Sequence, residues 1–70
     1  MRTNFPEQGL TVITTGNKRQ GWTTRVWTCD RFGRLWDVVC EYWVRGGKTA
    51  HASLVKRVRD GEFARPSVAA

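Results

Sequence analysis

Residues 21–44 constrain the fold of this chain more than any other stretch. They read GWTTRVWTC, then DRFGR, then LWDVVCEYWV. Two runs this rich in β-branched and aromatic residues favour strands, and a glycine-containing turn between them favours a hairpin. We therefore predict one long, strongly twisted β-hairpin with its turn at Phe32-Gly33.

The register of this hairpin follows from the position of its turn. Pairing around Phe32-Gly33 places Trp27 near Val38, and Trp22 near Trp43. Because a slip of one residue exchanges the two faces of a strand, the choice of the core face depends on this register. The face predicted to be the core carries Trp27, Cys29, Trp36, Val38, Cys40, Tyr42 and Val44. The opposite face carries Trp22, Val26, Leu35, Val39 and Trp43.

The two cysteines of the chain are predicted to be free thiols. With Cys29 opposite Trp36, Cys40 lies four residues further along the same face, roughly 13 Å away. A disulfide requires Cα atoms within about 7 Å, so both residues are interpreted as small core side chains. Two cysteines and one histidine also make a zinc site improbable, and no metal or cofactor is expected.

The rest of the chain is divided by its turn-forming residues. Residues 1–8 are interpreted as a flexible arm, residues 9–60 as one small domain, and residues 61–70 as a loose tail in which Phe63 docks. Residues 9–15 are rich in Thr, Val and Ile and predict a strand, and residues 16–21 predict a loop. Arg45-Gly46-Gly47-Lys48 predicts a tight turn. After it, the sequence allows either a short strand over 49–52 with a closing strand over 54–58, or a helix from Ala50 to Asp60 capped by Thr49.

This order of elements resembles the SH3-like small β-barrel. The likeness lies in the opening Gly9-Leu10-Thr11-Val12, in the Trp-containing hairpin, and in the closing stretch of residues 51–58. It implies an all-β, five-stranded barrel. The layout is similar to that of type II dihydrofolate reductases, but Lys48-Thr49-Ala50-His51 stands where their Val-Gln-Ile-Tyr signature would be. His51, Ser53, Leu54 and Lys56 are similar to the ending of integrase C-terminal DNA-binding domains.

The helical alternative implies a different architecture for the same chain. It gives a three-stranded antiparallel sheet plus a C-terminal helix, which is similar to the DNA-binding arms of tyrosine recombinases. Ala50, Leu54, Val55 and Val58 would then form one apolar stripe on the helix, and Gly61 would end it.

The charge of the chain indicates the class of its partner. The net charge is +6, and the ten Lys/Arg and four Asp/Glu of residues 9–60 account for all of it. Cations in loops can contact phosphates without reading a base sequence. The chain is therefore predicted to be a small basic protein that binds DNA or RNA through Lys18, Arg19, Arg31, Arg34, Arg45 and Lys48.

Trp22 and Trp43 are predicted to form an aromatic interface beside these cations. Three interpretations remain open for the pair: a covered core position, a contact between copies in a homo-oligomer, or a platform for base stacking. The alternative function is a protein-interaction module, such as a phage- or plasmid-type regulator or inhibitor. It would dock on an acidic surface of a larger host protein.

No grouping in the sequence predicts an enzyme. His51 is the only histidine and is expected to be packed, and Asp37 and Glu41 lie about 13 Å apart along a strand. Gly46-Gly47-Lys48 lacks the rest of a phosphate-binding P-loop. The N-terminus has no apolar leader and no run approaches the ~20 residues of a membrane span, so a cytoplasmic protein without a membrane partner is expected.

Overall fold

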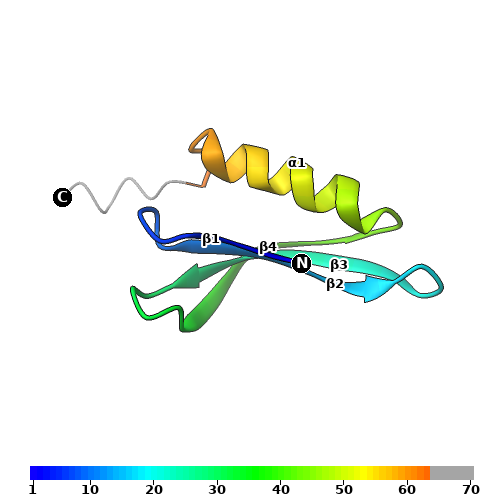
Figure 1. Cartoon of the computed structure of the whole chain (residues 1–70), viewed down its shortest axis with the longest axis horizontal. Helices are drawn as coiled ribbons and strands as arrows, with labels where there is room; N and C mark the ends of the chain where they lie inside the picture. Colours follow the sequence, from blue (N-terminus) through cyan, green and yellow to red (C-terminus); the bar gives the residue numbers. More distant parts are fainter. Residues whose placement is uncertain (64–70) are drawn as a thin grey trace.

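The computed structural model describes residues 1–63, which form one antiparallel sheet and one helix. The strands are β1 (Arg2–Phe5), β2 (Leu10–Asn17), β3 (Gly21–Cys29) and β4 (Leu35–Val44), and the helix is α1 (Gly47–Arg59). The strands lie in the order β1-β2-β3-β4, so each pairs with its neighbour in the chain. Figure 1 shows α1 lying across one face of this sheet.

The β-rich class expected from the sequence is confirmed, but the five-stranded barrel is wrong. The sheet is open, and residues 47–59 form a helix where a short strand and a closing strand were expected. The buried residues of α1 are Gly47, His51, Leu54 and Val58, whose spacings of four, three and four suit a helix rather than a strand. The helical alternative was closer, although it lacked β1 and began the helix three residues too late.

The N-terminal arm expected from the sequence is an edge strand in the structure. Arg2–Phe5 pairs antiparallel with β2, with Thr3 opposite Val12 and Phe5 opposite Leu10. The side chains of this short strand alternate between the two faces of the sheet. Thr3 and Phe5 point toward the helix, whereas Arg2 and Asn4 point away from it, as expected for a strand. Of the C-terminal tail expected over residues 61–70, only residues up to 63 are described, and Phe63 packs against the core as predicted.

The core lies between α1 and the two central strands. Leu10 and Val12 from β2, Val26 from β3, and Leu54 and Val58 from α1 are all at most 3% exposed. This core is small, and the helix contacts β2 and β3 rather than reaching over β4. As a consequence, β4 remains partly exposed on the helix side, and no helix among the described residues 1–63 covers the opposite face of the sheet.

A bulge in β4 overturns the predicted register and with it the predicted core face. Trp27 lies opposite Val38 as expected, but Val26 then pairs with Cys40, which leaves Val39 as an extra residue. From there to the end of the strand every partner is shifted by one. Trp22 is therefore opposite Val44 instead of Trp43. A second irregularity, between Trp27 and Cys29, places Cys29 opposite Leu35 instead of Trp36. Both cysteines are free thiols.

The helix in the described part of the chain is too short and too polar to span a lipid bilayer.

Candidate nucleic-acid interface

The loop between β2 and β3 carries two exposed cations, Lys18 and Arg19. The Asn17 side-chain oxygen accepts hydrogen bonds from the backbone N–H groups of Arg19 (3.0 Å) and Gln20 (2.8 Å). This local turn is the arrangement that favours Asn at the start of a loop. Because the turn is held by backbone groups, the side chains of Lys18 and Arg19 are left free at its tip, and both are exposed.

A second pair of cations lies at the corner where β4 passes into α1. Arg45 follows the last residue of β4, and Lys48 lies in the first turn of the helix. The first residue of the helix, Gly47, has no room for a side chain because the Trp22 indole occupies the space beside it: a Cβ there would lie 2.4 Å from the ring. Trp22 thereby packs against the start of α1, at the corner that carries Arg45 and Lys48.

The loop and the corner meet at one end of the sheet. One hollow there is lined by Lys18, Arg45 and Lys48 around Trp22, and an adjoining one by Lys18, Arg19 and Arg45 around Trp43. The two hollows share Lys18 and Arg45, so they form one continuous surface that passes around the end of the sheet. We call the four cations Lys18, Arg19, Arg45 and Lys48 the basic end.

The acidic residues of the chain lie elsewhere. Glu41, in the middle of β4, is paired with Arg25 at 3.2 Å. The other five are in the β1–β2 turn, near the β3–β4 turn, or beyond the end of α1: Glu7, Asp30, Asp37, Asp60 and Glu62. Figure 1 shows that these segments lie at the opposite end of the sheet from the β2–β3 loop and the β4–α1 corner.

The electrostatic consequence is a strongly positive end. Among the described residues, the ion pairs use Arg25, Lys56 and Arg57 as cations and none of the basic end. The first turn of α1 contains no acidic residue and no side-chain cap, so the positive end of the helix dipole adds to the same potential.

Two of the predicted site residues, Arg31 and Arg34, are not part of this end. They flank the β3–β4 turn, where the Asp30 carboxylate accepts hydrogen bonds from the backbone N–H groups of Phe32 (2.8 Å) and Arg34 (2.9 Å). The bond from Arg34 is the main reason why the pKa of Asp30 lies below its ordinary value. This turn is at the far end of the sheet, so the six predicted cations form a group of four and a separate pair.

The two tryptophans predicted to share one strip lie on opposite faces of the sheet. Trp22 is opposite Val44 on the helix side, and Trp43, one residue earlier on β4, therefore points to the uncovered side. Trp22 is half-buried against Gly47, whereas Trp43 is 69% exposed. The structure brings both to the basic end, one on each side of it.

The exposed Trp43 ring is held in place from below. Its six-membered ring edge lies so close to Gly21 that a Cβ on that residue would be 2.8 Å from the ring. Gly21 also has a φ of +94°, which glycine adopts without strain. The indole therefore rests on bare backbone with its remaining surface open. Sequence reasoning missed this contact, because it depends on the bulge that sets the register.

A buried cluster of polar side chains around His51 joins the helix to the sheet. The His51 Nδ1 lies 2.7 Å from the Thr14 hydroxyl, and its Nε2 lies 2.8 Å from the Thr3 hydroxyl. Thr14 in turn donates to the Thr24 hydroxyl at 2.7 Å. A neutral imidazole with its proton on Nδ1 satisfies the whole chain, since Thr3 can then donate to Nε2. His51 is a packed residue, as the sequence indicated, and it fixes the helix to β1 and β2.

We expect His51 to make the protein less stable in mild acid. Burial, and then the nearby N-terminal amino group, lower the pKa of His51 below its ordinary value. The unfolded chain therefore takes up the proton first as the pH falls below about 6.5, and the stability present above that pH is lost. Urea unfolding between about pH 7 and pH 5 should show a falling midpoint, and His51→Leu should flatten this dependence. An equally steep fall in the variant would contradict this role for His51.

No family model, curated protein or solved structure matches this chain in the comparisons with known proteins. In the part of the chain that the structure describes, no three His, Cys, Asp or Glu side chains come together as metal ligands. The interpretation of the site therefore depends on its own geometry and charge.

Proposed function

We propose that the chain is a small cytoplasmic nucleic-acid-binding protein whose basic end contacts the phosphate backbone. The observation that carries this proposal is the gathering of Lys18, Arg19, Arg45 and Lys48, none of them in an ion pair among the described residues, around two hollows that contain a tryptophan each. Flexible cations at a surface free of carboxylates are suited to a polyanion, and they bind it without reading its sequence.

The exposed indole of Trp43 favours a single strand over a duplex as the ligand. Bases in a duplex are stacked on one another, whereas those of a single strand can stack on an aromatic side chain between cations that hold the adjacent phosphates. Trp43 offers such a surface, with Lys18, Arg19 and Arg45 around it. Trp22 contributes mainly by shaping the corner, because it is packed against the helix start.

The salt dependence of binding tests the part played by the basic end. A double variant Arg19→Ser with Lys48→Ser should lower the slope of log affinity against log salt by roughly 1.4, since each phosphate contact with a single strand contributes about 0.7. The affinity at low salt should fall by at least about tenfold. The measurement is a fluorescence-anisotropy titration of a labelled single-stranded oligonucleotide at several salt concentrations.

The matched control removes the same charge from the other end of the sheet. Arg31→Ser with Arg34→Ser also lowers the net charge by two, but it leaves the basic end intact. We expect it to change the slope much less. Equal effects of the two double variants would show that binding follows net charge alone, and a wild-type protein without salt-dependent binding would refute the proposal.

The second candidate function is a protein-interaction module, and the exposed side chains of β4 favour it. Trp36, Val38, Val39 and Tyr42 are between 41% and 64% exposed, which is unusual for apolar residues in a small protein. A phage- or plasmid-type regulator that docks on a host protein would present such a strand. Loss of a protein partner in Trp36→Ala, with oligonucleotide binding unchanged, would favour this function over the first.

A further inference from the structure

The two edge strands of the sheet, β1 and β4, differ in length and in composition. β1 is four residues long and carries Arg2 and Asn4, so it offers little to a further strand. β4 is ten residues long, eight of them apolar or aromatic, and it contains neither lysine nor proline. Its charged residues are Asp37 and Glu41, and Glu41 is neutralised by Arg25. Of the features by which proteins usually protect a free edge, β4 has the bulge at Val39, but the strand is long and has no lysine or proline.

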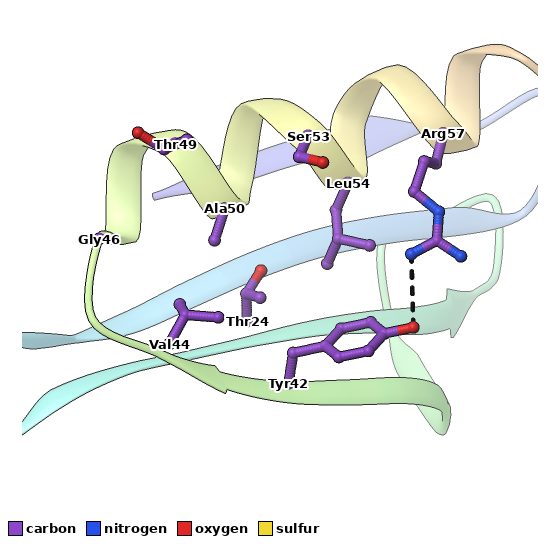
Figure 2. Close-up of a pocket in the computed structure, with 9 residues that line it drawn as sticks. All are labelled: Thr24, Tyr42, Val44, Gly46, Thr49, Ala50, Ser53, Leu54 and Arg57. Atoms are coloured by element: carbon purple, nitrogen blue, oxygen red, sulfur yellow. Dashed lines mark hydrogen bonds between the residues drawn. The ribbon is translucent and has the colours of Figure 1, made fainter.

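An apolar groove runs along the same edge on the helix side. Because α1 lies over β2 and β3, the space between the helix and β4 is left open, with a volume of about 540 Å³. Figure 2 shows Tyr42 and Val44 of β4 on its floor, with Ala50, Ser53 and Leu54 of α1 along its wall. Arg57 closes one end through a hydrogen bond to the Tyr42 hydroxyl at 3.3 Å.

We propose that β4 is the contact of a symmetric homodimer, in which it pairs antiparallel with β4 of a second copy. The sheets then join into one of eight strands, and both helices lie on the same face of it. Side chains of the second β4 that point to the helix side extend the floor of the groove, because neighbouring strands in a sheet carry their side chains in register.

The charge distribution favours a second copy as the occupant of this edge. In an antiparallel pair, the two basic ends lie at opposite ends of strands about 34 Å long, so the repulsion between two chains of net charge +6 is small where they meet. The middle of β4 is free of uncompensated cations. A parallel arrangement would bring the basic ends together and is disfavoured for that reason.

The exposed area is of the order that such a contact needs. Trp36 is 64% and Tyr42 is 42% exposed, and these two side chains alone present roughly 200 Å² per copy. That is about a quarter of the ~800 Å² that each partner of a stable complex buries. Val38, Val39, the groove and those backbone groups of β4 that point away from β3 lie on the same edge and add to it.

Sedimentation equilibrium of the full chain at micromolar concentration tests the dimer. The expected mass is twice the 8.0 kDa of the chain. Val38→Lys on the edge and Tyr42→Lys on the groove floor should each weaken association by at least about tenfold, because each introduces an unpaired ammonium group from both copies into the contact. Phe32→Lys is the control, since it also replaces an exposed apolar side chain with a cation but lies in the turn, outside β4.

The outcomes divide clearly. A dimer that dissociates in the two β4 variants and persists in Phe32→Lys supports the proposal, provided that circular dichroism shows each variant folded. A monomeric wild-type chain overturns it, as does a dimer that neither β4 variant weakens, or an assembly larger than a dimer. The proposal does not depend on nucleic-acid binding, because no oligonucleotide is present in the measurement.

Discussion

Replacing Trp43 with alanine will weaken binding of single-stranded oligonucleotides by roughly 5- to 150-fold and leave duplex binding nearly unchanged. The range corresponds to the 1–3 kcal/mol that stacking of one base on an aromatic side chain contributes. Trp43 is 69% exposed and rests on Gly21, so its removal takes away a surface for a base and little of the core. The measurement is a pair of anisotropy titrations at one salt concentration, with a single strand and with a duplex.

The same strand supplies a matched control for this variant. Trp36 is 64% exposed and lies at the other end of β4, away from the basic end. Trp36→Ala removes an equal aromatic surface but no cation-flanked platform, so single-strand binding should be retained. If Trp36→Ala weakens binding as much as Trp43→Ala does, the aromatic contact is not located at the basic end. If neither has an effect, binding rests on phosphate contacts alone.

Serine substitutions at two adjacent glycines should change the stability of the protein in opposite directions. Gly47→Ser places a Cβ 2.4 Å from the Trp22 ring, which forces the indole or the helix start to move and should destabilise the fold by about 1–3 kcal/mol. A Cβ at Gly46 meets nothing within 4 Å. Gly46 also has a φ of −106° and is the N-cap without a side-chain bond, so Gly46→Ser should gain a few tenths of a kcal/mol from capping.

Chemical denaturation of the two variants, compared with the wild type, measures both effects. The midpoints should move to lower denaturant for Gly47→Ser and slightly higher for Gly46→Ser, with unchanged slopes. Equal shifts in the same direction would contradict the packing of Trp22 on the helix start. Gly47→Ser should also weaken oligonucleotide binding, because the β4–α1 corner positions Arg45 and Lys48.

The strands could be predicted from the sequence because their signal is local. Thr, Val and Ile in residues 9–15, and the two Trp-containing runs around Phe32-Gly33, favour extended backbone whatever surrounds them. The structures of β1 and α1, in contrast, depend on the parts of the sheet against which they pack. Arg2–Phe5 becomes a strand only because β2 offers it an edge, and the C-terminal segment becomes a helix because Leu54 and Val58 have a bare sheet face to cover.

For the candidate site, too, some features could be predicted from the sequence and others depended on the fold. Lys18, Arg19 and Arg45 are loop residues and Lys48 lies in the first turn of α1, and the sequence predicted all four as exposed cations from the neighbouring glycines and the charge. Their grouping could not be predicted, because Lys18-Arg19 and Arg45-Lys48 are brought together by the antiparallel pairing of β2, β3 and β4. The same pairing sends Arg31 and Arg34 to the other end of the sheet.

The sequence by itself determined the β-rich class, the long hairpin, the free thiols and the surplus of positive charge, because each depends on residues close together or on composition. Only the tertiary structure decided which face of the hairpin is covered. One extra residue at Val39 shifts the register of β4, and since successive strand side chains point to opposite faces, this shift separates Trp22 from Trp43. Whether a strand tolerates such a bulge depends on what packs above it, and no local pattern contains that information.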